Sequence, residues 1–217
     1  MSETSKISPS ALWIRRWLVL VGLMVYAMIL IGGATRLTDS GLSITEWNPV
    51  SGALPPLSGA AWEVEFAKYR ETAEYQLVNQ GMSMAEFQKI FWWEWGHRFF
   101  GRMIGLVAVL GAAVFAVRGW LSRRLGWHLA ALIGLGGLQG AIGWWMVASG
   151  IGETTRVDVA PYRLMTHFTL ALLIIAYVTW LWLDLGEKAR PGVARSVRTA
   201  SLVLLGAIFV QMAAGAL

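Results

Sequence analysis

Two of the three histidines in the chain stand where polar segments meet long apolar ones. His97 lies in the run Phe91-Trp-Trp-Glu-Trp-Gly-His-Arg-Phe-Phe-Gly-Arg102, and His167 closes the run Tyr162-Arg-Leu-Met-Thr-His167. An imidazole at the mouth of an apolar helix is costly unless it has a partner, and a metal or a haem is one such partner. The pair therefore indicates a metal or haem site, while a hydrogen-bonded structural role is the alternative for either histidine alone.

Composition places these residues in a membrane protein. The chain has 217 residues, of which 56% are hydrophobic, and 13 are tryptophans, which is typical of a polytopic membrane protein. Cysteine is absent, which excludes disulfides, zinc-thiolate sites, iron–sulfur clusters and thiol nucleophiles. The net charge of +5 does not indicate nucleic-acid binding, because the basic residues form short clusters beside apolar segments.

The apolar segments predict an all-α integral membrane protein, built as an antiparallel four-helix transmembrane bundle plus a fifth span. A spanning helix needs about 20 mostly apolar residues. A long outer loop, residues 35–98, contains helix-like stretches around Ala60–Tyr75 and Ser83–Trp93. The five predicted spans are Trp17–Ala34, Phe99–Val117, Leu125–Ala148, Leu164–Leu183 and Thr199–Leu217.

Clusters of Lys and Arg fix the predicted orientation. They precede the first span, join the second to the third and join the fourth to the fifth, so all fall on one side, the cytoplasm. The cluster residues are Arg15, Arg16, Arg118, Arg123, Arg124, Lys188, Arg190, Arg195 and Arg198. The prediction is a multi-pass protein with a cytoplasmic N-terminus and loop 35–98 outside.

The same pattern divides the chain into four predicted parts. These are a cytoplasmic tail (1–16), a four-helix half (17–185), a cytoplasmic linker (186–198) and the first span of a second half (199–217). Because the chain stops in an apolar run at Leu217, we expect it to be a piece of a longer protein.

The predicted topology gives the two histidines similar depth. His97 opens the second span from the outside, and His167 lies about one turn into the fourth span from the same side. Helices of a four-helix bundle can bring such residues face to face, as a haem with two axial histidines requires. His128, at the cytoplasmic end of the third span, has no counterpart and is interpreted as interfacial.

Residues near the histidines suit a haem but also have plainer interpretations. Gly101 and Gly105 leave a strip free of side chains on the His97 face, which fits either a flat macrocycle or helix packing. Four arginines could bind propionates through charge-assisted forks or simply extend to the membrane interface. They are Arg36, Arg98, Arg102 and Arg163.

Glu94 lies three residues before His97, on the face that would meet the haem edge. Glu94-x-x-His97 also matches the motif of di-iron bundles. That site requires a second Glu-x-x-His and two further glutamates from other helices. No other predicted span contains a glutamate, so the di-iron interpretation fails.

Several long motifs together resemble the haem A synthase family, in the cysteine-free part of the branch related to the cytochrome oxidase assembly factor. They are Gly32–Ser43, Glu46-Trp47-Asn48-Pro49 with Pro55-Pro56, Phe91–Arg102, Gly137–Val147 and Tyr162–His167. The resemblance implies an oxidoreductase of the bacterial inner membrane, which converts a methyl group of haem o to the formyl group of haem a for terminal oxidase biogenesis. It also implies two similar halves, with substrate haem o in this one and a haem b cofactor in the other, beyond residue 217.

By the same resemblance, His97 and His167 are the axial ligands of the substrate haem and Glu94 is the catalytic carboxylate. The implied partners are haem o, membrane lipid, haem o synthase and terminal oxidase assembly proteins; a homo-oligomer is left open and no nucleic acid is expected. Two alternatives remain from the residues themselves. One is a b-type cytochrome that exchanges electrons with quinol, and the other is a non-catalytic protein that handles haem during assembly.

Overall fold

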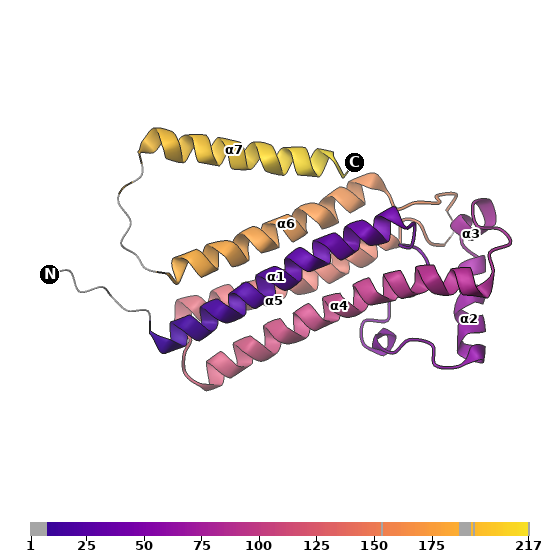
Figure 1. The fold of residues 1–217 in the computed structure, drawn as a ribbon, viewed down its shortest axis with the longest axis horizontal. Coiled ribbons are helices and arrows are strands. Elements are labelled where there is room, and N and C mark those ends of the chain that lie inside the picture. The colour runs from indigo at the N-terminus through magenta and orange to yellow at the C-terminus, as the bar shows by residue number, and fades with distance from the viewer. Residues whose placement is uncertain (1–7, 153, 187–191, 193, 217) are drawn as a thin grey trace.

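The computed structural model describes residues 8–152, 154–186, 192 and 194–216, and these form helices without a strand (Figure 1). Five helices are long and apolar enough to cross a membrane, so the predicted all-α class and the five spans are confirmed. The long helices are α1 (Pro9–Leu37), α4 (Met84–Val117), α5 (Arg123–Val147), α6 (Pro161–Asp184) and α7 (Arg195–Ala214). The short ones are α2 (Gly59–Arg70), α3 (Ala73–Leu77) and the 3-10 turn η1 (Ser51–Ala53).

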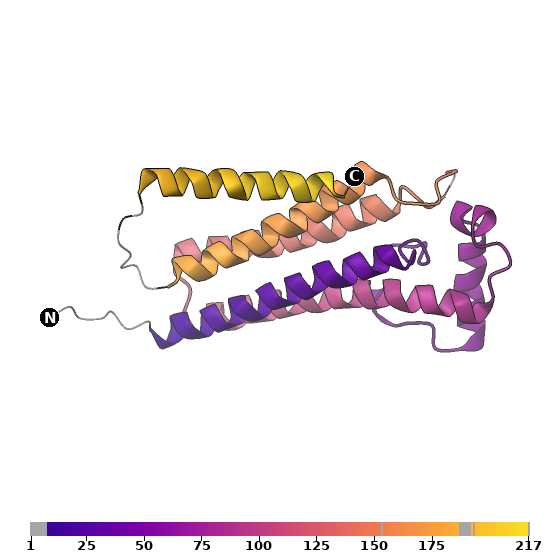
Figure 2. The same cartoon turned by 45° about the horizontal axis from the view of Figure 1, so that its top comes forward.

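Helices α1, α4, α5 and α6 form the bundle. Helix α1 packs against α4 and α6, and α5 packs against the same two, so the four close around a common core. Helix α7 lies along α6 on the outside of the bundle (Figures 1 and 2). One end of the bundle carries the segments 38–83 and 148–160 and is called the loop end below.

Trp17 illustrates how closely α1 and α4 approach. Its indole N–H donates to the Val107 carbonyl at 3.1 Å, and its ring meets Phe115 edge-on with centroids 5.4 Å apart. A Cβ on Gly111 would lie 2.1 Å from the indole nitrogen, so only glycine fits beneath this ring.

Two spanning helices begin well before the predicted apolar windows. Helix α1 starts at Pro9 because the Ser8 side chain accepts from the Ala11 N–H and proline suits the first helical position. Helix α4 starts at Met84 behind a capping box of Ser83 and Glu86, so the predicted loop helix and the second span form one continuous helix.

Helix α2 packs against the start of α4 through a small aromatic core, formed by Phe66, Tyr69, Phe87 and Phe91. The single helical stretch predicted around residues 60–75 is interrupted, because Thr72 caps the separate helix α3. The predicted linker 186–198 falls largely outside the described residues, as do Lys188 and Arg190. The four-part division of the chain stays a prediction.

Candidate functional site

A cavity of about 520 Å³ lies inside the bundle, in the half nearer the loop end. All four bundle helices line it, and His97 from α4 and His167 from α6 both belong to its wall. Its size falls within the range of about 300–1,000 Å³ that is usual for ligand pockets. The structure thus brings the two histidines to one internal space.

The cavity has an apolar part and a polar end. Its deeper wall includes Val25, Ile29, Ile104 and Ile174, each well inside a spanning helix, and Met212 of α7 contributes at one side. Apart from His97, His167 and Gln139, the polar residues of the wall gather at the loop end. They are Thr35, Arg36, Asp39, Glu74 and Asp158. This distribution suits a large ligand with a hydrocarbon body and one polar edge.

His97 is oriented by the end of α1. Its Nδ1 lies 3.5 Å from the Thr35 hydroxyl, which itself donates to the Ile31 carbonyl at 2.9 Å. A Cβ on Gly32 would lie 3.1 Å from the His97 Cε1 atom. Because the threonine proton is already used, its oxygen is free to accept from Nδ1–H, which is how outer partners commonly orient a ligating histidine.

His167 is held against α5. Gln139 donates from its side-chain nitrogen to the His167 carbonyl at 3.1 Å and approaches the ring Nε2 at 3.4 Å. The ring Nδ1 and the Gln139 Oε1 are buried without a hydrogen-bond partner among the described residues. Buried polar atoms are rarely left unpaired, so the His167 Nδ1 is an atom that a ligand in the cavity would suit.

Each imidazole faces a glycine on the neighbouring helix. Gly143 of α5 stands against His167, where an added Cβ would lie 2.9 Å from Cε1, and Gly32 of α1 stands against His97. The two contacts are alike, because in each a spanning helix has a glycine where the imidazole of the neighbouring helix lies against it. Neither glycine was predicted from the sequence as part of the site, although each lies in a glycine-rich stretch of one of the family motifs.

The donor set fits a haem better than a bare metal ion. No cluster of three or more His, Cys, Asp or Glu side chains that could hold an ion occurs among the described residues. Two histidines supply only two ligands, which suffices when a macrocycle supplies the others. The paired imidazoles, the orphaned Nδ1 and the glycine clearances therefore fit a haem held between α4 and α6.

Glu94 does not belong to the cavity wall. The residue is 3% exposed, and one carboxylate oxygen accepts from the Ser43 hydroxyl at 2.7 Å and the Ile44 N–H at 2.8 Å. The other oxygen pairs with Arg98, one turn further along α4. Both oxygens are thus engaged by the chain itself. The carboxylate fastens to α4 the start of segment 38–83, which is called the outer segment below because it lies outside the four-helix bundle.

Of the four arginines predicted to contact propionates, only Arg36 is among the residues that line the cavity. Arg36 lines the cavity and forms ion pairs with Asp158 at 3.0 Å and Asp39 at 3.5 Å. Arg163 donates to the Trp145 carbonyl at 2.7 Å, and its guanidinium lies over the Trp145 ring.

Arg98 and Arg102 bind the outer segment instead. Arg98 donates to the carbonyls of residues 44 and 46 at 2.8 and 2.9 Å. Arg102 donates to those of residues 48 and 49, both at 2.8 Å. Neither arginine is among the residues lining the cavity, and the same holds for Gly101, which faces Met28, and for Gly105.

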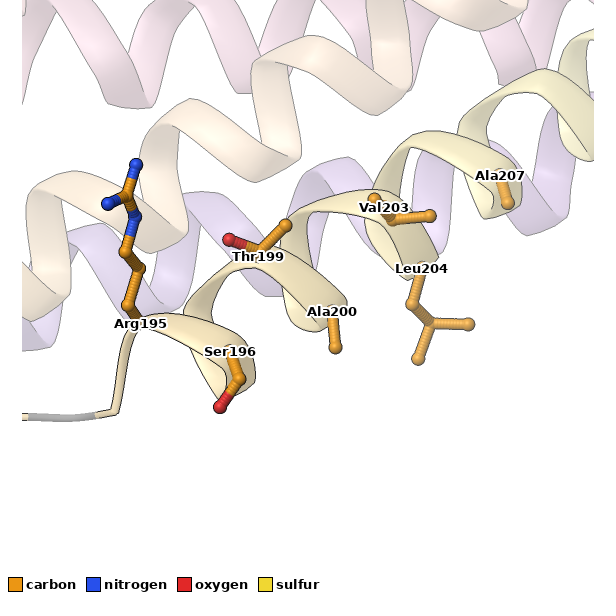
Figure 3. Close-up of a pocket in the computed structure, with 7 residues that line it drawn as sticks. All are labelled: Arg195, Ser196, Thr199, Ala200, Val203, Leu204 and Ala207. Carbon is orange, nitrogen blue, oxygen red and sulfur yellow. The ribbon is translucent and has the colours of Figure 1, made fainter.

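Other features lie away from the cavity. His128 lies at the opposite end of the bundle, where its Nδ1 is 2.7 Å from the Tyr177 hydroxyl. This histidine therefore has a hydrogen-bond partner of its own, away from the cavity. A separate shallow hollow runs along α7 and is lined by that helix alone, from Arg195 to Ala207 (Figure 3). It presents no imidazole or carboxylate.

Comparisons with known proteins follow the same direction. The profile of the family described as cytochrome oxidase assembly protein, COX15-CtaA, matches residues 15–217. A heme A synthase of Hyphomonas neptunium is 72% identical over 98% of this chain and 61% of its own length. A heme A synthase of Caulobacter sp. (strain K31) is 50% identical over 93% of this chain and 58% of its own length. One of Methylobacterium sp. (strain 4-46) is 54% identical over 94% of this chain and 56% of its own length. The chain therefore spans about three-fifths of the length of these relatives; no solved structure matches.

Proposed function

The chain belongs to the COX15-CtaA family of cytochrome oxidase assembly proteins, and from this premise we propose that it is the substrate-binding part of a haem A synthase. In this proposal His97 and His167 ligate the iron of haem o, and the whole protein oxidises a methyl group of that haem to a formyl group. The observation that carries the proposal is the convergence of the two histidines on one internal cavity.

The surrounding residues have defined tasks in this proposal. Thr35 and Gln139 orient the two imidazoles from their neighbouring helices, and Gly32 and Gly143 leave space for the rings. The apolar wall excludes water and accommodates the hydrocarbon body of the ligand. The iron, when bound, would supply the redox chemistry, while these residues would bind and orient the macrocycle.

The predicted contacts of the arginines and glycines with the ligand depend on where each residue lies relative to the cavity. The position of Arg36 in the cavity wall supports the proposal that it contacts a propionate. Ligand contacts remain predictions for Arg98, Arg102, Arg163, Gly101 and Gly105. The catalytic role of Glu94 also stays a prediction. Its test is Glu94→Gln, which should leave haem bound but block conversion of haem o, and full activity in that variant would refute the role.

Location and partners complete the proposal. We infer the bacterial inner membrane, with the N-terminus in the cytoplasm and the loop end outside, because the basic clusters lie at the other end of the bundle. Haem o synthase would supply the substrate, terminal oxidase assembly proteins would receive the product, and haem b would occupy the part of the protein that this chain does not cover.

The ligation is tested with ferric haem b as the probe, titrated into the chain in detergent micelles. Wild type and the control His128→Ala should give the low-spin absorption spectrum of an iron with two histidine ligands. His97→Ala and His167→Ala should each lose it, because one axial ligand is then missing. A wild-type spectrum in either of these variants would overturn the assignment. Extraction of pigments from cells that make haem o then separates a synthase, which accumulates haem a, from a b-type cytochrome.

A further inference from the structure

A second glutamate, Glu74 of α3, lines the cavity, whereas Glu94 does not. Its side chain lines the polar end of the cavity, the residue is only 5% exposed, and its Oε2 atom has no hydrogen-bond partner among the described residues. A buried carboxyl oxygen without a partner costs free energy. The atom is therefore available to a ligand, whereas both oxygens of Glu94 are occupied.

The position of Glu74 is fixed by its surroundings. The Thr72 hydroxyl donates to the Tyr69 carbonyl at 2.7 Å and accepts from the Tyr75 N–H at 3.3 Å, which sets the start of α3. Tyr69 itself is fully buried in the aromatic core and accepts from the Asn79 amide at 2.8 Å. Helix α3 is thus anchored where it places one carboxyl against the cavity.

The other charged groups at this end already have partners. Asp158 and Asp39 both pair with Arg36, at 3.0 and 3.5 Å. Glu74 is the charged side chain of the polar end that has an uncommitted buried oxygen. An amphipathic macrocycle seated in the cavity would turn its own polar edge towards this end, since the deeper wall is apolar.

We propose that the Glu74 carboxyl is a ligand contact, which donates a hydrogen bond from its protonated form to a carboxylate side chain on the edge of the bound macrocycle. This inference rests on the proposed function, because it takes the ligand between His97 and His167 to be a haem, whose ionic edge consists of propionates. It gives the long outer segment a direct part in recognising the ligand.

The protonation state follows from the surroundings. Burial raises the pKa of Glu74 to about 8, although hydrogen bonding by the Tyr69 hydroxyl lowers it. The negative charges of Glu94, Asp39 and Asp158 raise the pKa further. At neutral pH the carboxyl is therefore mostly protonated and can donate to a ligand carboxylate. Above pH 8 it is ionised and repels the same group.

The test titrates ferric haem b into the chain in micelles at pH 7 and pH 9. If only the protonated form binds well, the competent fraction falls to about one tenth at pH 9, and the affinity should drop about tenfold. Glu74→Gln keeps a neutral donor and should show no such drop. Glu71→Gln, an exposed neighbour outside the cavity, is the matched control and should behave as wild type. Glu74→Leu should bind weakly at both pH values.

A second arm needs no variant: the dimethyl ester of haem b carries no charged carboxylate for ionised Glu74 to repel, so its affinity for wild type should fall much less than tenfold between pH 7 and pH 9. The inference is overturned if Glu74→Gln keeps the tenfold drop, or if the ester shows it. A low-spin spectrum together with either result would refute the Glu74 contact while leaving the ligation by His97 and His167 intact. Failure of wild type to give that spectrum would refute both.

Discussion

Replacement of Gly143 by alanine tests whether the glycine opposite His167 determines ligand geometry. The added Cβ would lie 2.9 Å from Cε1, 3.4 Å from Nδ1 and 3.6 Å from Nε2 of the imidazole. The first distance is about 0.5 Å shorter than ordinary van der Waals contact, so the ring must move or tilt. A ligating group needs placement within about 0.5 Å of its productive position, which is the size of this displacement.

Overpacking of this kind typically costs about 1–3 kcal/mol. If the cost falls on the ligated geometry, it converts to a roughly 5- to 150-fold weaker haem affinity. Gly140→Ala is the matched control, because it lies one turn earlier on α5 and its Cβ would meet nothing within 4 Å. Both substitutions should raise helix propensity by about 1 kcal/mol, so the difference between them isolates the ring contact.

The assay is a titration of ferric haem b into each variant, followed by the low-spin absorption band, with thermal unfolding of the free chain as a check of folding. We expect Gly140→Ala to bind as wild type and Gly143→Ala to bind weakly or to give a five-coordinate spectrum. Equal affinity and equal spectra for the two variants would refute the argument that the glycine provides clearance for the ligating ring.

Three further predictions concern stability, each measured by thermal unfolding in detergent. Glu94→Leu should destabilise by about 3–5 kcal/mol, because it leaves the partly buried partner Arg98 unpaired; a loss below 1 kcal/mol would contradict a structural ion pair. Gly111→Ala should cost about 1–3 kcal/mol because its Cβ would meet the Trp17 indole at 2.1 Å, whereas Gly105→Ala on the same helix should not destabilise. For Glu74, the folded pKa of about 8 exceeds the ordinary value of 4.5, so its contribution to stability is complete below pH 4.5 and is lost as the pH rises through 8. Glu74→Gln should flatten the decline between pH 5 and pH 8, and parallel curves for the two proteins would contradict the shift.

The helical architecture could be predicted from the sequence because it follows from length and hydropathy. Each window of about 20 apolar residues became a helix, and the alternation of spans placed His97 and His167 at the same end of the bundle. The helix starts could not be obtained in this way. They are set by the caps at Ser8 and Ser83, which act on polar residues outside the windows.

The site was predicted less completely, because its details depend on contacts between distant segments. Glu94 is near His97 in sequence, yet Ser43 and Arg98 take up its oxygens and keep it out of the cavity wall. Glu74 reaches that wall only through the packing of α3, for which no local pattern exists. The clearance of Gly143 likewise becomes visible only when α5 and α6 are placed together.

The attachment of the outer segment to α4 has a consequence for the substitutions that the chain tolerates. Arg98 and Arg102 hold that segment through four backbone carbonyls, at residues 44, 46, 48 and 49. A carbonyl is present whatever the side chain, so natural variation at these four acceptors leaves the attachment unchanged. The two arginines have no such freedom, because lysine cannot reproduce a planar fork that donates in two directions. Side chains at these four positions can therefore change without loss of these contacts, whereas the contacts themselves require both arginines.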